Sequence, residues 1–272
     1  MMPIFIKTSL RAAGFFAALC MLLSGFVLVP AAFSTEQKTA ASPLPQIKAF
    51  QPGESLTYEV SWSDMVKAGS AVMEVKGERL ADGREVLRFI ITSRTEGALG
   101  RLYPIGDTVQ SVFDLATMQS LSYSSVEIHG KKARRKYLYF DHVNRTVTTA
   151  LNEDPLKTAS IPDRVQDNLS SLYYLRTRED FVVGKPITFE AFDSGSSVTV
   201  EIQTLGREQV KTPAGEFSTI KVKAYKGLFV SEGEIFVWLT DDARKVPVLI
   251  KSTLKFGTLV FTLAEQKPGI NR

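Results

Sequence analysis

The sequence predicts an all-β fold, a curved antiparallel sheet or barrel-like meander with one short helix packed against it. Three observations support this prediction. Apolar and polar residues alternate through many short runs, as they do in half-buried strands. Turn-forming residues separate these runs. One segment in the middle of the folded region has helical spacing instead.

The chain begins with the residue order of an export signal. Lys7 and Arg11 precede an apolar run from Ala12 to Val29, which is followed by proline and small residues. This order is typical of a secretory signal peptide. We therefore expect a signal peptide over 1–34 and a periplasmic protein. If the leader is not cleaved, the apolar run is long enough to anchor the protein in a membrane.

The composition of the mature chain excludes several kinds of site. Its only cysteine, Cys20, lies inside the predicted signal peptide, so no disulfide, thiolate nucleophile or cysteine metal site is expected. The whole chain has 33 Lys+Arg and 29 Asp+Glu, and loss of the leader brings these numbers closer together, so nucleic-acid binding is not expected. Residues 35–49 are polar and contain prolines, which predicts a flexible spacer.

A single β-rich domain is predicted over 50–266. In the run 54–62, every second residue is apolar, so one face is expected to be buried. Asp82-Gly83 predicts a hairpin, and the segment from Thr212 to Gly215 predicts a tight turn. The same alternation recurs in Ala71 to Val75, Leu87 to Ile91, Val109 to Leu115, Ile220 to Ala224, Val246 to Ile250 and Leu259 to Leu263.

The segment 167–178 departs from this alternation and predicts a helix. Asp167 or Asn168 can cap its start. Its apolar positions Leu169, Leu172 and Tyr173 follow the i, i+3, i+4 spacing of a helix.

The predicted helix separates two segments, 50–160 and 180–266. Gly53-Glu54-Ser55-Leu56-Thr57-Tyr58 resembles Gly184-Lys185-Pro186-Ile187-Thr188-Phe189. The segments are therefore either two similar halves or parts of one domain in which hairpin-forming sequences recur.

No recognisable catalytic motif is found. The chain lacks a Gly-x-Ser-x-Gly elbow, a His-Glu-x-x-His motif, a phosphate-binding glycine loop and paired metal-ligand spacing. His129 and His142 are interpreted as exposed turn residues, and Asp241-Asp242 as a turn between strands, although adjacent carboxylates can also hold a cation. We expect no catalytic residues, no cofactor and no metal, with a carboxylate-based hydrolase as the less favoured alternative.

The strand around Phe236 and Trp238 is apolar on both faces, since Ile235, Val237 and Leu239 lie on the other side. It is either a central strand covered by the helix or a strand with one face lining an apolar cavity for a lipid-like ligand. The candidate ligand-binding residues are Trp62, Phe236, Trp238 and Arg176. Arg176 is a helix arginine that can pair with one of the acids Glu54, Glu216 and Asp167 or face a pocket.

The most basic stretch of the chain precedes an aromatic run and predicts one of two roles. It is either a solvated sheet edge protected from unwanted pairing or an anion-binding site for a lipid head group. The candidate anion-binding residues are Lys131, Lys132, Arg134, Arg135 and Lys136.

Several short motifs span nearly all of the chain after the spacer. They are Phe50-x-Pro52-Gly53-Glu54-x-Leu56-x-Tyr58-x-Val60, Phe113-Asp114, Asp167-x-Leu169-Ser170 with Tyr173 and Arg176, Thr212-Pro213-Ala214-Gly215-Glu216-Phe217, and Trp238-Leu239-Thr240-Asp241-Asp242. With these motifs the chain resembles a bacterial exported family known as domain of unknown function 3108. The resemblance implies an envelope location and a β-rich fold, and it carries no catalytic residue.

These observations favour a non-catalytic periplasmic envelope protein that binds an apolar or amphipathic ligand, such as lipid or lipoprotein. The alternative is a structural or assembly partner that docks onto an envelope complex through a sheet edge or the basic stretch. In neither case is nucleic acid an expected partner.

Overall fold

The computed structural model describes residues 47–63, 65–130, 132–193, 195–226, 233–254 and 257–270. The predicted signal peptide, most of the predicted spacer and Lys131 of the basic stretch lie outside these residues.

Strands dominate the described part of the chain, and two short helices interrupt them. The strands are β1 (Ser55–Trp62), β2 (Val66–Arg79), β3 (Glu85–Thr95), β4 (Ile105–Asp114), β5 (Gln119–His129), β6 (Lys132–Asp141), β7 (Thr146–Leu151), β8 (Asp154–Ser160), β9 (Ile187–Asp193), β10 (Ser196–Thr212), β11 (Gly215–Lys226), β12 (Gly233–Thr240), β13 (Pro247–Leu254) and β14 (Gly257–Lys267). The helices are α3 (Gly97–Leu102) and α4 (Asn168–Arg176).

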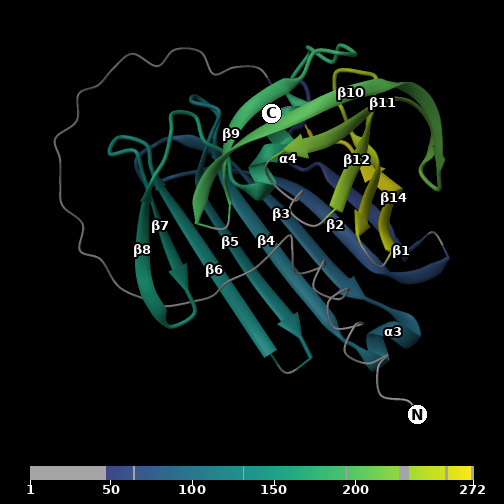
Figure 1. Cartoon of the computed structure of the whole chain (residues 1–272), viewed down its shortest axis with the longest axis horizontal. Coiled ribbons are helices and arrows are strands. Elements are labelled where there is room, and N and C mark those ends of the chain that lie inside the picture. Colours follow the sequence, from purple (N-terminus) through teal and green to yellow (C-terminus); the bar gives the residue numbers. More distant parts are fainter. Residues whose placement is uncertain are drawn as a thin grey trace.

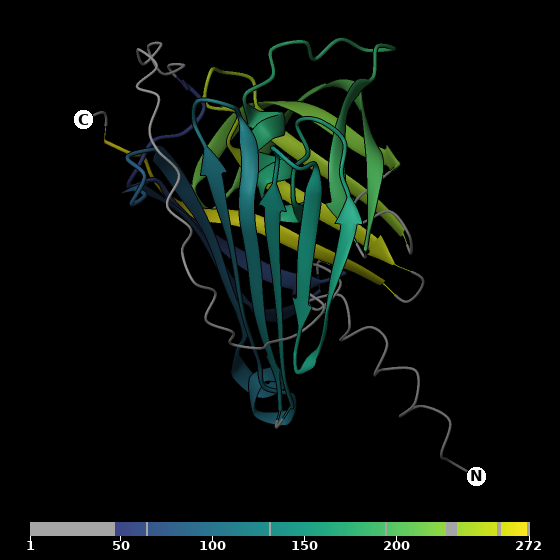
Figure 2. The same ribbon diagram turned by 90° about the vertical axis from the view of Figure 1, so that its left-hand side faces the viewer.

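All these strands belong to one curved antiparallel sheet of 14 strands (Figure 1). Strands β1 to β8 form one meander and β9 to β14 form a second, because each strand pairs with its neighbour in sequence. Strand β1 also pairs with β14, which joins the two meanders into one sheet. The predicted all-β class is therefore confirmed, and Figure 2 shows the long strands of the first meander as one wall of the molecule.

The alternation in the sequence explains which side of each strand is buried. Leu56, Tyr58 and Val60 of β1 are at most 1% exposed, whereas Glu59 between them is exposed. The hairpin between β2 and β3 turns at Gly83, whose φ of +86° is in the region that glycine adopts without steric cost. The period of two thus gives the sheet one inner face, and the hollow on that side holds the core.

The sheet has two strand edges, β8 and β9, and the chain between them bridges the gap at one end. The amide of Ile161 donates to the carbonyl of Arg145, beside β7. Farther along, the amide of Gln166 donates to Glu190 and its carbonyl accepts from Phe192, both in β9. This segment then enters α4, which Figure 1 shows in the hollow of the sheet.

Helix α4 is the helix that the sequence predicts, capped by Asp167, and it ends at Arg176. Helix α3 was not predicted, because six residues are too few for a helical period to stand out from the surrounding strands. Gly53 and Gly184 both adopt a positive φ, of +91° and +83°, shortly before β1 and β9. The two resembling sequences thus have similar turns, and internal repetition of the two halves stays a prediction.

Candidate functional site

Asp167 fixes α4 to the first meander. Its Oδ1 accepts hydrogen bonds from the amides of Leu169 and Ser170, at 2.7 and 2.8 Å. Its Oδ2 accepts from the hydroxyls of Ser111 in β4 and Ser120 in β5. Burial raises the pKa of Asp167, although these four hydrogen bonds oppose the shift. One carboxyl group therefore caps the helix and ties it to two strands.

Arg176 fixes the other end of α4. The guanidinium is 1% exposed, and its Nη1 and Nη2 lie 2.7 and 2.9 Å from the two carboxylate oxygens of Glu54. Nη2 also donates to the carbonyls of Ala49 and Arg244. Of the two alternatives for Arg176, the structure shows the ion pair with an acid. The pair holds the helix against the start of β1.

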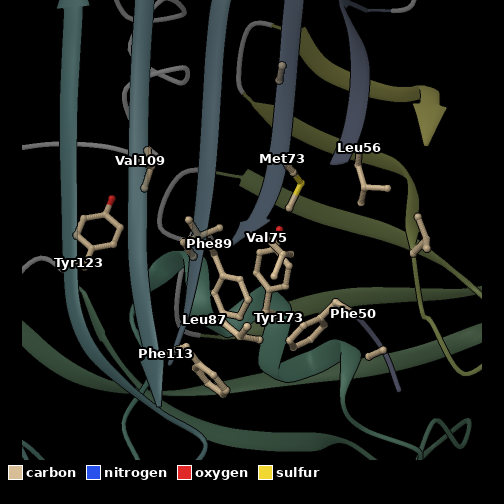
Figure 3. Packing of buried hydrophobic residues seen from close by; sticks show 14 of the residues in the cluster. Phe50, Leu56, Met73, Val75, Leu87, Phe89, Val109, Phe113, Tyr123 and Tyr173 are labelled. Carbon is tan, nitrogen blue, oxygen red and sulfur yellow. The ribbon is translucent and has the colours of Figure 1, made fainter. Parts of the chain in front are cut away.

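Stacked and edge-on aromatic rings pack one side of α4 against the sheet. The ring of Tyr173 stacks on that of Phe89 at 3.7 Å between centroids, and Phe50 meets both rings edge-on. Figure 3 shows these rings together, with Phe113 beside Phe89. This cluster fills the hollow on that side, so α4 is held by packing as well as by its polar ends.

An apolar cavity of about 180 Å³ lies on the other side of α4, between the helix and the inner face of the sheet. Its wall is almost entirely hydrocarbon and comes from both meanders. Cavities lined in this way exclude water and accept apolar groups. Representative lining residues are Met73, Leu172, Val200, Val237, Ile250 and Phe261.

Polar side chains border the cavity on the side of β3 and β4. Ser93 and Asp107 line the cavity and lie opposite each other on these strands. The row of polar side chains continues across the sheet toward β6. Asp107 lies opposite Glu127 on β5, and Glu127 lies opposite Arg134 on β6. Asp107 is 2% exposed and Glu127 is 3% exposed. The inner surface therefore changes from hydrocarbon to polar at Asp107.

Both buried carboxyl groups hold protons more tightly than usual. Burial raises the pKa of Asp107 to about 6, and the nearby His129 opposes the shift. Burial and the neighbouring Asp107 raise the pKa of Glu127 to about 8, against the effect of Arg134 and Lys136. Near neutral pH, Glu127 is therefore largely protonated while most of Asp107 is ionised.

These shifts predict that stability falls as pH rises. A carboxyl group whose pKa is raised by folding stabilises the protein below its unfolded pKa, and this stabilisation is lost as pH passes the folded value. For Glu127 the window runs from about pH 4.5 to about pH 8. Urea unfolding at several pH values should show a decrease on the order of 5 kcal/mol across this window. Glu127→Gln should remove most of it, and an equal slope in wild type and variant would contradict the assignment.

The predicted ligand-binding residues lie elsewhere. Phe236 and Trp238 point to the outer face of β12, into a shallow groove that they share with Lys221, whose Nζ lies 4.8 Å from the Trp238 ring centroid. It is the opposite face, with Ile235 and Val237, that lines the apolar cavity. One of the two alternatives stated that one face of this strand lines an apolar cavity, and the face with Ile235 and Val237 does so. Ligand binding at the outer groove stays a prediction.

Trp62 and Arg176 are also outside the cavity lining. The Trp62 ring packs on the backbone of Gly257, where an added Cβ would lie 2.4 Å from the ring. Arg176 faces Glu54. The contact of Trp62 joins β1 to β14, and the contact of Arg176 joins α4 to the start of β1. Binding of a ligand by these two residues stays a prediction.

The basic stretch is divided between the two faces of β6. Lys136 is buried, with Nζ 5.8 Å from the centre of the Tyr123 ring, and Arg134 is half-buried on the same inner face. Arg135 is exposed on the outer face, and Lys132 is exposed at the start of the strand. The described residues of the stretch therefore do not form one continuous cationic surface, and anion binding by them stays a prediction.

The prediction that both histidines are exposed is wrong, whereas the prediction of a turn position is confirmed for His142, between β6 and β7, and wrong for His129. His129 is the last residue of β5, and its Nε2 lies 3.3 Å from Asp107 Oδ1 with the side chain only 18% exposed. His142 is half-buried and its Nε2 lies 2.6 Å from the carbonyl oxygen of Ser120. Each imidazole therefore lies against a neighbouring strand, His129 against β4 and His142 against β5.

Sequence reasoning missed Asp107 and Glu127. A usable signal exists at Asp107, because it occupies the same face of β4 as Ile105 and Val109, both buried apolar residues. A carboxylate in an inward position of an alternating strand is uncommon unless it is paired or functional. The sequence alone could not indicate that the residue opposite Asp107 on the neighbouring strand would be a second acid.

The described residues contain neither a metal-ligating cluster nor a helix of membrane-spanning length. No group of three or more potential metal-ligating side chains comes together among them. Neither of their helices is long and apolar enough to cross a membrane.

Comparison with known proteins places the fold and the family. Comparison with curated proteins gives no match. A β-barrel-like protein of the domain of unknown function DUF1849 from Brucella abortus is similar in structure, with a TM-score of 0.55 and 10% identity, over 82% of this chain and 100% of that chain. This likeness supports the barrel-like fold.

Two other solved structures are less similar. A protein from Bacteroides fragilis, described as exported and as having a YmcC-like fold, has a TM-score of 0.32 and 12% identity, over 80% of this chain and 97% of that chain. A protein from Parabacteroides distasonis, described as a lipoprotein, has a TM-score of 0.32 and 11% identity with the same coverage. The model of the family described as Protein of unknown function (DUF3108) matches residues 57–264, and the chain therefore belongs to the DUF3108 family.

Proposed function

We propose that this protein is a non-enzymatic protein of the bacterial envelope that holds the apolar part of an amphipathic ligand, such as a lipid or the acyl chain of a lipoprotein. The observation that carries the proposal is the apolar cavity between α4 and the inner face of the sheet. Because its lining comes from both meanders and from the helix, the whole fold contributes to one binding space.

The size and chemistry of the cavity support an apolar guest. A dry cavity of about 150 Å³ in another protein is known to bind benzene, and this one is slightly larger at about 180 Å³. It can therefore accept a ring or a segment of an acyl chain, with the remainder of the ligand outside. The export signal predicted over 1–34 supports an envelope location, where such ligands are abundant.

Filling the cavity tests the proposal. Ala71 is buried and lines the cavity, so Ala71→Leu places additional methyl groups in the space that the ligand would occupy. We expect at least about a tenfold loss of affinity for an apolar fluorescent probe, without loss of the folded state. Ala133 is exposed on the outer face of β6, so Ala133→Leu serves as the matched control and should leave binding unchanged.

Lipid analysis provides the second arm of the test. Solvent extraction of protein purified from the envelope, followed by mass spectrometry, should recover an amphipathic species from wild type and much less from Ala71→Leu. Equal probe binding and equal lipid content in wild type and Ala71→Leu would overturn the assignment of the cavity as the binding space.

A docking role is the second candidate, and one observation favours it. Arg135, Tyr137 and Tyr139 are exposed side by side on the outer face of β6. Cationic and aromatic side chains of this kind are common in protein interfaces. In-cell cross-linking of wild type and Arg135→Glu should show a changed set of partners if this face docks onto an envelope complex, and an identical set would contradict it.

A further inference from the structure

The polar border of the cavity contains acceptors that lack a partner among the described residues. Asp107 Oδ2, Glu127 Oε1 and Ser125 Oγ have no hydrogen-bond partner there. All three residues are at most 3% exposed. Buried polar atoms in folded proteins nearly always have a partner, so three unpartnered atoms close together point to a molecule that supplies one.

The strand register places these atoms together. Asp107 and Glu127 lie directly opposite each other on β4 and β5, and such cross-strand neighbours have Cβ atoms about 5 Å apart. Ser125 precedes Glu127 by two residues on the same inner face and lies opposite Val109, which lines the cavity. The three groups therefore form one polar patch that adjoins the hydrocarbon wall.

The charges around the patch favour an uncharged partner. Arg134 lies opposite Glu127 and Lys136 lies opposite Ser125 on β6, so two cationic side chains accompany the two carboxyl groups. His129 is in contact with Asp107. Because the raised pKa of Glu127 leaves this residue largely protonated near neutral pH, Asp107 is the ionised group of the pair. The Asp107 carboxylate disfavours an anionic head group, and Arg134 and Lys136 disfavour a cationic one. A neutral hydroxyl group can donate to Asp107 and accept from Ser125 or the protonated Glu127 without a charge penalty.

We propose that Asp107, Ser125 and Glu127 form a subsite for the hydroxyl group of an uncharged amphipathic ligand whose hydrocarbon chain occupies the apolar cavity. This inference rests on the proposed function and extends it to the class of ligand. The apolar wall holds the chain, while the polar patch selects a head group that donates a hydrogen bond.

A matched pair of probes tests the subsite. Octanol and octyl methyl ether share a hydrocarbon chain and an oxygen acceptor, but only octanol donates a hydrogen bond. Their affinities can be measured by displacement of an apolar fluorescent dye from the purified full-length protein. We expect wild type to bind octanol about tenfold more tightly than the ether. In the double variant Asp107→Leu/Glu127→Leu, this preference should fall to about twofold or less.

Controls separate the possible results. Glu59 is an exposed acid on β1, and Glu59→Leu should keep the wild-type preference. Equal affinity of wild type for octanol and the ether would overturn the subsite while leaving the cavity as an apolar binding space. An unchanged preference in a folded double variant would also overturn it. Absence of binding by both probes would overturn the proposed function itself. If the double variant does not fold, the comparison of the two probes in wild type decides.

Discussion

Replacing Arg176 by methionine is expected to lower the free energy of unfolding by about 3–5 kcal/mol. The change leaves the carboxylate of Glu54, which is 2% exposed, buried without its cation. It also removes the donors to the carbonyls of Ala49 and Arg244. An unpaired charge in the interior costs more than the original pair contributes. Urea unfolding followed by tryptophan fluorescence measures the loss.

Two comparisons test whether the loss comes from the unpaired charge. Arg178 lies two residues farther along and pairs with Asp180 at 2.7 Å, but its side chain is 33% exposed. Arg178→Met should therefore cost only about 0–1 kcal/mol. The double variant Glu54→Gln/Arg176→Met should recover part of the stability lost in Arg176→Met, since no buried charge remains. Equal losses in Arg176→Met and Arg178→Met would contradict this account of the helix.

Replacing Asp167 by alanine is expected to cost about 3 kcal/mol, the second large effect. The loss of one carboxyl group removes the cap of α4 and leaves the buried hydroxyls of Ser111 and Ser120 without their acceptor. Because α4 covers the cavity, we also expect weaker binding of apolar probes. Thermal and urea unfolding, together with probe titration, measure both effects.

Asp167→Asn is the matched control. The amide oxygen can still accept from the amides of Leu169 and Ser170, and its NH₂ group can donate to the two serine hydroxyls after they rotate. Since burial already raises the pKa of Asp167, an uncharged side chain suits this site. We expect a cost below about 1 kcal/mol. A similar loss in the alanine and asparagine variants would show that the hydrogen bonds do not carry the effect.

The sequence predicts the strands and α4 well because both have local causes. The alternation in β1 follows directly from burial of one face, and Asp167 is recognisable as a cap because its side chain bonds to amides two and three residues away. Arg176 was recognisable as an unusual position that could pair with an acid or face a pocket. Glu54 was one of three acids considered as its partner, and only the folded chain shows that these two residues pair across 122 residues.

The site is less predictable because it depends on which strands face each other across the hollow. The sequence shows that Phe236 and Val237 lie on opposite faces of one strand, but it does not show which face is inside. The larger aromatic side chains on the outer face made that side the stronger candidate. In the folded sheet, Val237 lies on the inner face and lines the cavity instead.

Locating a bound hydrocarbon is the most direct test of the central claim that the hollow of the sheet is the binding space. Crystals of the protein soaked with 1-bromooctane would reveal the bromine by anomalous scattering. We expect the bromine and its alkyl chain between α4 and the inner face, near Leu172, Val237 and Ile250. Hydrocarbon bound only in the outer groove at Phe236 and Trp238, with the inner cavity unchanged, would contradict it.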